Sequence, residues 1–322
     1  DEDGLPDIAV GRFPVRNAEE LAAVVSKTLD YERSLPGGLW QRQAAYITGE
    51  GHYGRVVDAV LEGIFKKVVD GTHPADVEVD VTYANPSSSY FWPPAEFADK
   101  VRQRMEEGSL FFTYVGHGAP EAVDRIRTRG GVHAVMDVAS VTRLARRAGR
   151  PIMTILACWT AAFTDPKDCI LEALFRNPEG PVATLGATIP SAPFGNAVFG
   201  YELARAYHDP ANERLGPAVD AARRALLGEE KTPLRLSLDQ VGELMEQEGS
   251  LQEELREHIA MYVLFGDPAL VFRRPSRELE IEATDEARAG STVEVGIRAP
   301  KDCRSVLVTL EVPRLKLKGK LP

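Results

Sequence analysis

The sequence predicts an α/β protein built on a mainly parallel sheet that helices cover on both faces. Several short segments are apolar throughout, which is typical of strands buried on both sides. These segments alternate with amphipathic helical patterns, the order that gives a parallel sheet. The composition, with 44% hydrophobic and 27% charged residues, is that of an ordinary globular protein. A length of 322 residues allows one large domain and a smaller one.

The first elements are a short strand at residues 7–12 and a helix that begins after Asn17. Asn17 is a suitable N-cap, and two glutamates follow it in the first turn. The apolar residues that share one face of this helix are Leu21, Val24, Val25 and Leu29.

The strand–helix alternation then fills most of the chain. Strands are predicted at residues 44–48, 77–83, 110–115, 152–156 and 182–185. Helices are predicted at residues 56–69, 95–107, 138–148, 197–207 and 218–227. The charged segment 229–255 has a weak helical pattern, so we expect a solvated helix or a mobile insertion there.

The composition changes after Asp267-Pro268. Residues 278–283, 292–298 and 305–312 alternate in polarity and predict three strands of an antiparallel module. About 45 residues are too few for a β-sandwich of about 100 residues, so the module is either truncated or completed elsewhere. We therefore divide the chain into a domain at residues 1–275 and a partial β module at residues 276–322.

Charge and cysteine content exclude several classes of protein. The net charge of −10 argues against broad nucleic-acid binding, and no apolar run is long enough to predict insertion into a membrane. Three cysteines make no disulfide framework, and the histidines lack zinc-site spacing. The chain starts at Asp1 without Met or a signal peptide. We take it as a processed piece, whose compartment cannot be inferred from its start.

Two predicted strands end in residues that can perform chemistry. The strand at 110–115 leads into Gly116-His117-Gly118, and the strand at 152–156 leads into Ala157-Cys158. Active sites of parallel sheets gather at the carboxyl ends of strands. A cysteine beside an imidazole is the minimal nucleophile and acid for acyl transfer. The backbone N–H groups of Gly118 and Cys158 are the candidate oxyanion hole.

Simpler interpretations exist for each of these residues. A cysteine after a strand is usually packed in the core, and a loop histidine is usually solvated. His52, close to Glu50, is a rival base, although no strand leads directly into it. Cys169 and Cys303 lack a glycine-flanked strand end, so we expect both to be structural.

The order of these motifs resembles the caspase–haemoglobinase clan of cysteine peptidases and is similar in detail to the gingipain family, the C25 peptidases. Five segments carry the resemblance, in the same order over about residues 7–275: residues 7–13 with the helix that follows, 114–118, 156–159, 182–188 and 264–270. The β tail is similar to the start of the family's immunoglobulin-like domain.

The resemblance implies roles for individual residues. Cys158 is then the nucleophile, His117 the proton shuttle, and Glu50 the acid that orients the histidine, although Glu50 is equally consistent with a solvated loop residue. Trp159 and the loop at residues 190–194, with Pro193 and Phe194, would border the substrate cleft; Trp159 alternatively belongs to the core. The partners implied are a protein or peptide substrate and an upstream segment of the same precursor. No metal is needed, and a structural calcium ion is left open.

The sequence also departs from the family. Members with basic specificity carry an aspartate shortly after the glutamate, where this chain has only residues 51–55, and Asp58 is expected inside the helix. Specificity for Arg or Lys is therefore doubtful. Arg55 instead could meet an acidic side chain or face solvent, and Arg125, Arg127 and Arg129 could shape the cleft or meet an acidic partner.

Three functions follow from these observations. The first is a cysteine endopeptidase that is secreted or lies at the surface of a bacterial cell. The second is a catalytically silent or regulated relative that binds peptides or serves as a scaffold. The third is an intracellular caspase-like signalling protease, so the cytoplasm is not excluded.

Overall fold

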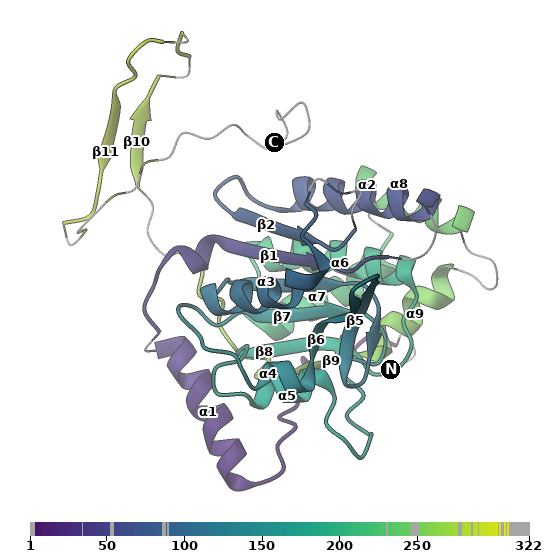
Figure 1. Cartoon of the computed structure of the whole chain (residues 1–322). Coiled ribbons are helices and arrows are strands. Elements are labelled where there is room, and N and C mark those ends of the chain that lie inside the picture. The colour runs from purple at the N-terminus through teal and green to yellow at the C-terminus, as the bar shows by residue number, and fades with distance from the viewer. Residues whose placement is uncertain are drawn as a thin grey trace.

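A six-stranded sheet forms the centre of the protein (Figure 1). The computed structural model describes residues 4–33, 35–51, 55–85, 88, 90–229, 231–245, 251–275, 279–284, 286–288, 290–301, 303, 306 and 308. The strands, in spatial order, are β2 (Glu78–Tyr83), β1 (Gln43–Thr48), β3 (Phe111–Val115), β7 (Ile152–Leu156), β8 (Ala183–Ala187) and β9 (Tyr262–Phe265). All neighbours are parallel except β8 and β9, which confirms the mainly parallel sheet.

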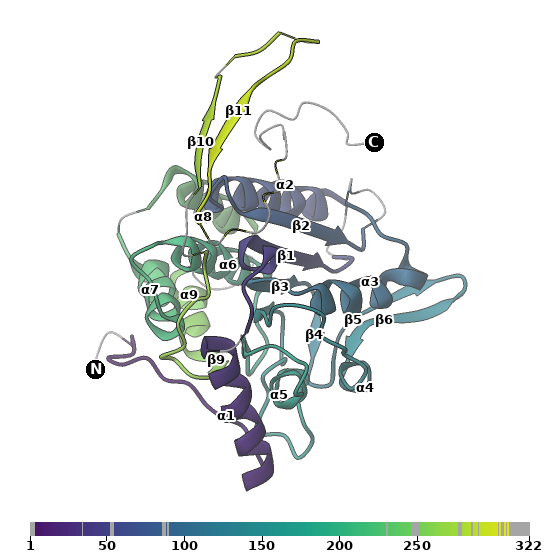
Figure 2. The ribbon, with the colours of Figure 1, turned by 90° about the vertical axis from the view of Figure 1, so that its left-hand side faces the viewer.

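Helices pack on both faces of this sheet (Figures 1 and 2). One face carries α2 (Arg55–Thr72), α6 (Pro193–His208), α7 (Leu215–Leu227), α8 (Pro233–Met245) and α9 (Leu251–Met261). The other carries α1 (Ala18–Arg33), α3 (Pro94–Glu107), α4 (Val138–Val141) and α5 (Ile170–Arg176). A 3₁₀ turn, Leu39–Arg42, precedes β1.

Strand β3 shows how the sequence supplies two cores. Successive side chains of a strand point to opposite faces. Phe111 packs with the residues of α6 and α7, whereas Phe112 and Tyr114 pack with those of α3 and α5. A strand that is apolar throughout is therefore required at this position, because both of its faces are covered.

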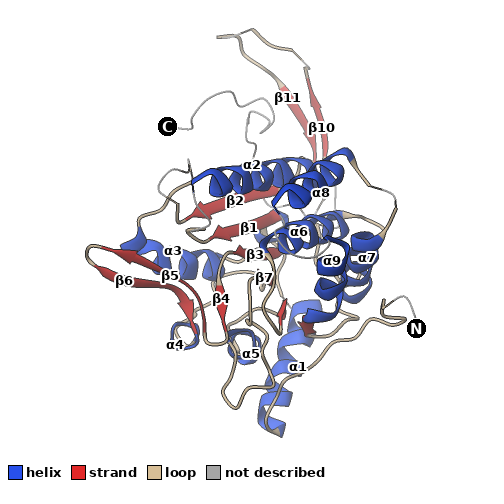
Figure 3. Ribbon diagram, turned by 90° about the vertical axis from the view of Figure 1, so that its right-hand side faces the viewer, coloured by secondary structure: helices blue, strands red, loops and turns tan. Residues whose placement is uncertain are grey.

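A second, smaller sheet follows β3, and the sequence did not predict it. It consists of β4 (Gly118–Ala119), β5 (Ala122–Thr128) and β6 (Gly131–Asp137), all antiparallel. Its β5–β6 hairpin projects from the body beside α3 (Figure 3). Arg125 and Arg127 lie exposed along β5, and Arg129 lies exposed in the turn.

The beginning of the chain differs from the prediction. No strand forms at residues 7–12: Arg12 makes a single bridge to Phe265, while Ile8 and Val10 are exposed. Helix α1 does start after Asn17, whose Oδ1 accepts a hydrogen bond from the N–H of Glu20 at 2.8 Å. The apolar face that the sequence indicates on this helix is not its buried face, because Leu21, Val25 and Leu29 are exposed and only Val24 is buried.

The helix predicted at residues 138–148 ends after Val141. Asp137 caps its start by accepting from the N–H of Ser140. Beyond the helix, the N–H groups of Ala145 and Arg147 donate to the side chain and the carbonyl oxygen of Glu106 in α3. This tertiary partner replaces the bonds that a longer helix would have made.

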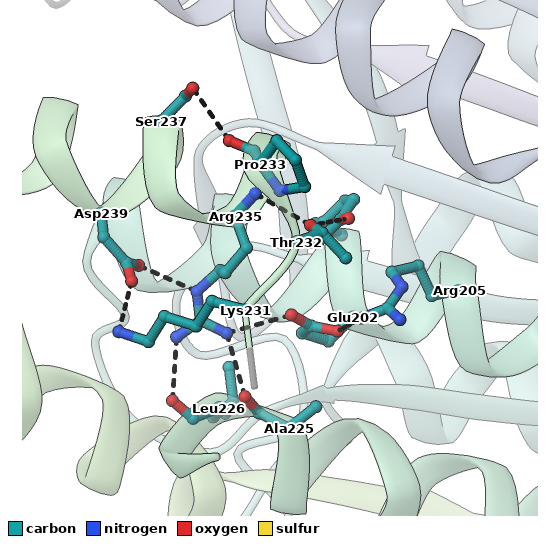
Figure 4. Close-up of polar contacts among 11 residues, drawn as sticks. Glu202, Arg205, Ala225, Leu226, Lys231, Thr232, Pro233, Arg235, Ser237 and Asp239 are labelled. Atoms are coloured by element: carbon teal, nitrogen blue, oxygen red, sulfur yellow. Dashed lines mark hydrogen bonds and ion pairs between the residues drawn. The ribbon is translucent and has the colours of Figure 1, made fainter. Parts of the chain in front are cut away.

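The segment 229–255 is not a solvated insertion, which corrects the prediction. Its helices α8 and α9 are packed on α6 and α7, and Leu238 and Leu255 are buried. Arg235 anchors α8 through a buried polar cluster, drawn in Figure 4. The partners of its guanidinium are the Glu202 and Asp239 carboxylates and the carbonyl oxygens of Ala225 and Leu226.

The tail contains a two-stranded hairpin of β10 (Glu280–Ala283) and β11 (Val295–Arg298), which stands apart from the body in Figures 1 and 2. Most of the third predicted strand, 305–312, lies outside the described residues, so the immunoglobulin-like module and the domain boundary at residue 275 stay predictions. No helix in the described part of the chain is long and apolar enough to cross a membrane.

Candidate active site

Three candidate residues follow neighbouring parallel strands at the same depth. One row of the sheet register aligns Thr48 of β1, Val115 of β3 and Leu156 of β7. Glu50, His117 and Cys158 each stand two residues beyond that row. The parallel sheet therefore brings all three to one edge. The strand-end reasoning predicted this juxtaposition for His117 and Cys158, and the family resemblance added Glu50.

The loop of His117 is held by a tyrosine and an aspartate. The hydroxyl of Tyr114 donates to Asp124 Oδ2 at 2.7 Å, and the backbone N–H of His117 donates to the same oxygen at 3.3 Å. A Cβ at Gly116 would lie 2.5 Å from the Tyr114 hydroxyl, so only glycine permits this approach. The ring Nε2 of His117 lies 2.5 Å from the carbonyl oxygen of Gly51.

The loops of the histidine and the cysteine are in direct contact. A Cβ built on Gly118 would lie 2.4 Å from the carbonyl oxygen of Cys158 and 2.8 Å from the Ala157 side chain. Gly118 is thus the residue that lets the two loops meet. The two proposed oxyanion donors, the N–H groups of Gly118 and Cys158, belong to these touching loops.

The sulfur of Cys158 contacts Ser191, a residue the sequence analysis did not single out. The half-buried Sγ accepts from the N–H of Ser191 at 3.3 Å and donates to its carbonyl oxygen, also at 3.3 Å. The Ser191 hydroxyl lies 3.9 Å away. Ser191 comes from the loop between β8 and α6, so only the fold brings it to Cys158.

A chain of buried polar groups continues from Ser191. Asn196 of α6 donates its amide N–H to the Ser191 hydroxyl at 2.9 Å. The Oδ1 of Asn196 accepts from the hydroxyl of Tyr262, and the Nε2 of His258 lies 3.2 Å from the same oxygen. Burial lowers the pKa of His258 and raises that of Tyr262 above its ordinary value, which keeps the Tyr262 hydroxyl protonated.

Trp159 turns the chain directly after Cys158. Its backbone φ of 63° is rare for a bulky residue. Its side chain is 39% exposed, so it belongs to the surface at the site and not to the core. The N–H of Trp159 donates to the carbonyl oxygen of Ile189, which ties this turn to the loop that carries Ser191.

Two hollows adjoin the site. An open groove of about 790 Å³ runs beside His117, between residues 117–125 and 165–167. A narrower cavity of about 120 Å³ lies between the sheet and helices α2 and α6. At the carboxyl edge of the sheet this cavity is lined by Gly49, Gly51, Gly116 and Pro193. The cavity explains why Val115 of the central strand β3 is only half-buried.

The remaining candidates lie as follows. The ring of Phe194 packs against Gly242 of α8 and the core, a position that gives its predicted place in the cleft no support. Arg55 is the first residue of α2, but its side chain, like the whole of His52, lies outside the described residues. Glu50 is half-buried.

The other two cysteines are unlike Cys158. Cys169 is fully buried at the start of α5, and burial raises the pKa of its thiol to about 12, which makes it unreactive. Cys303 is exposed in the tail. Asp267 forms the expected turn, since its Oδ1 accepts from the N–H of Ala269 at 2.8 Å. No trio of His, Cys, Asp or Glu side chains placed for a metal ion occurs among the described residues.

Comparison with solved structures finds the same fold in gingipains. The Arg-specific cysteine proteinase gingipain R (RgpB) superimposes with a TM-score of 0.59 at 19% identity, over 93% of this chain and 64% of that one. A complex of the pro- and mature domains of RgpB from Porphyromonas gingivalis gives 0.58 at 17% identity, over 92% and 64%. A third structure, described as a protease, gives 0.58 at 14% identity, over 92% and 63%.

These likenesses confirm the predicted gingipain-like α/β fold, and the chain spans less than two thirds of each of these structures. A search of curated proteins finds no match to the chain. A sequence model described as peptidase family C25 matches residues 1–273, which is most of the chain. The chain therefore belongs to peptidase family C25.

Proposed function

We propose that this protein is a cysteine endopeptidase that cleaves protein or peptide substrates at the edge formed by Glu50, His117 and Cys158. The observation that carries the proposal is the register row: three neighbouring strands each deliver one of these residues at the same depth. Membership of a peptidase family supports the same reaction class. The chemistry requires no metal ion.

The reaction would proceed through an acyl-enzyme. The Cys158 thiolate attacks the carbonyl carbon of the scissile bond, and the N–H groups of Gly118 and Cys158 stabilise the oxyanion. The proton that His117 took from the Cys158 thiol to form this thiolate passes to the departing amine, which leaves a thioester on Cys158. His117 then takes a proton from water, the hydroxide attacks the thioester, and the carboxylate product leaves as the thiol is restored.

Small side-chain rotations would start this sequence. At rest, the thiol donates to Ser191 and the His117 ring contacts Gly51. Catalytic hydrogen bonds in substrate-free enzymes often form only when substrate binds. Glu50 would orient the imidazole and favour its protonated form.

The surroundings suggest where substrate lies. We place the peptide along the groove beside His117, next to Trp159, with the side chain before the scissile bond entering the cavity at Gly116 and Pro193. The RgpB structure that contains pro- and mature domains supports an upstream segment as a partner of this chain too. Secretion or display at a bacterial surface is part of the proposal.

Cleavage of a diverse peptide library, read by mass spectrometry, tests the function. We expect cuts with a preferred residue before the scissile bond, and a loss of at least about 10⁴-fold in Cys158→Ala, because the nucleophile is irreplaceable. Equal cleavage by Cys158→Ala would contradict the proposal. If the folded parent cuts nothing, with or without an upstream segment, and a thiol-directed peptide probe does not label Cys158, the protein is a peptide-binding or scaffold member instead.

A further inference from the structure

Three polar groups of Ser191 lie near the sulfur of Cys158: its backbone N–H, its hydroxyl and its backbone carbonyl oxygen. Its N–H is 3.3 Å from Sγ and its hydroxyl 3.9 Å, while its carbonyl oxygen accepts the thiol proton at rest. The carbonyl oxygen favours the neutral thiol, because it accepts the thiol proton, whereas the N–H and the hydroxyl favour the ionised sulfur, because they are donors. Hydrogen bonds to the charged form of an acid favour that form.

The Ser191 hydroxyl is held from behind by an amide. Asn196 is buried and donates to the Ser191 Oγ at 2.9 Å. Because this oxygen already accepts from Asn196, its own proton is available to the sulfur. The hydroxyl of Tyr262, which donates to Asn196 Oδ1, fixes the amide in this orientation.

Two further elements, β9 and α9, contribute residues that contact Asn196. Tyr262 is the first residue of β9, and His258 belongs to α9; both are buried. The His258 ring lies against the backbone of α6 at Gly195, where a Cβ would be 2.3 Å from the ring. Nδ1 of His258 is 2.7 Å from the carbonyl oxygen of Glu254 and Nε2 is 3.2 Å from Asn196 Oδ1, so the ring lies between the backbone of α9 and Asn196.

From this geometry we propose that Ser191 is a further catalytic residue, which holds the sulfur of Cys158 in its reactive, ionised form, and that Asn196 is the positioning residue for Ser191. The proposal rests on Cys158 being the nucleophile. It adds a group from the β8–α6 loop to a site otherwise built from the ends of β1, β3 and β7.

The pH dependence of thiol alkylation tests this inference without any peptide substrate. Iodoacetamide reacts with the thiolate, so its rate at Cys158 across pH reports how readily that thiol ionises. The exposed Cys303 in the same chain serves as the internal reference. In Ser191→Ala and in Asn196→Ala we expect the Cys158 profile to move about 0.5–1 unit to higher pH, a three- to tenfold slower reaction at neutral pH.

Asn177→Ala is the matched control. Its amide also donates from a partly buried position, to the carbonyl oxygen of Val141 at 2.7 Å, but belongs to the end of α5. It should leave the Cys158 profile unchanged. A folded Ser191→Ala variant whose Cys158 profile matches that of the parent would overturn the proposal. Because Ser191→Ala removes only a hydroxyl group, it tests the proposal even if Asn196→Ala fails to fold. Intact peptide cleavage by Cys158→Ala would instead remove the proposed function, whatever the alkylation shows.

Discussion

The two clusters of polar side chains on either side of α6 differ in how completely they are enclosed. In the cluster around Arg235, the guanidinium is 1% exposed and bonds two carboxylates and two carbonyl oxygens (Figure 4). At the proposed active site, Glu50, His117 and Cys158 are only half-buried, and the thiol and the imidazole each contact a backbone carbonyl.

The difference separates a structural use of charge from a chemical one. A buried charge is tolerated when every group around it is paired, and the pairing fixes one geometry. A nucleophile must instead be able to exchange its partners and admit a substrate. Helix α6 serves both purposes: Glu202 on it faces the Arg235 cluster, and Asn196 near its start faces Ser191.

The largest effect should come from breaking the enclosed cluster. Arg235→Ala removes the fully buried partner of Glu202 and Asp239, which keep only the more exposed Arg205 and Lys231, and it leaves the carbonyl oxygens of Ala225 and Leu226 without this donor. We expect a loss of about 3–5 kcal/mol in the free energy of unfolding. Arg205→Ala is the matched control, because Arg205 pairs with the same Glu202 at 2.9 Å from a side chain that is 44% exposed. It should cost at most about 1 kcal/mol. Urea titrations of both variants measure this, and equal losses would show that enclosure does not set the cost.

A second pair of variants should separate an effect on kcat from an effect on Tm. Glu50→Gln keeps the shape of the side chain but removes the charge that we propose orients His117, so we expect kcat to fall about 10- to 100-fold with little change in Tm. Glu202→Gln should lower Tm while kcat of the folded protein is kept, because Arg235 loses a charged partner. The distinction fails if Glu50→Gln lowers Tm and leaves kcat unchanged.

The parts of the fold that could be predicted from the sequence are the apolar strands, and the parts that could not are those in which charged residues are buried or interrupt an apolar pattern. Strands that are apolar throughout leave a clear signal, and β1, β3, β7 and β8 lie where the sequence places them within one or two residues. Segment 229–255 was misjudged because Arg235 looks like a surface residue until its partners on α6 and α7 are known. The small β4–β6 sheet was missed because Arg125 and Arg127 interrupt its apolar pattern.

The residues of the candidate site also divide into those with a signal in the sequence and those without one. Cys158 and His117 could be proposed from the sequence because a strand leads into each of them, and the register of β3 and β7 brings the two strand ends to one edge. Ser191 and Asn196 carry no such signal, since the loop before α6 reaches Cys158 only through tertiary packing. The sequence does hold one trace of it: Pro190 and Pro193 flank Ser191 and mark a turn where a strand ends.

Lys27 is intermediate between the enclosed Arg235 cluster and the half-buried site, because it is a buried cation whose hydrogen bonds go to carbonyl oxygens and not to carboxylates. The apolar pattern of α1 pointed elsewhere, yet Lys27 is 3% exposed and donates to the carbonyl oxygens of Phe175 and Asn177. Burial, with a smaller contribution from the nearby Arg150, lowers the pKa of Lys27 from 10.5 to about 7. Carbonyl oxygens satisfy its hydrogen bonds but do not offset the cost of burying its charge as the carboxylates do for Arg235.

This arrangement makes stability depend on pH in a definite direction. Above pH 7 the folded chain loses the proton of Lys27, whereas the unfolded chain keeps it up to about pH 10, so the unfolded state binds more protons and the free energy of unfolding rises with pH. The contribution is about 1 kcal/mol between pH 7.5 and 8.5. Lys27→Met should remove this slope, whatever constant cost it adds by leaving two carbonyl oxygens without a donor. Urea titrations of parent and variant at the two pH values give the slopes, and identical slopes would mean that Lys27 stays protonated in the fold and that carbonyl oxygens alone can hold a buried ammonium.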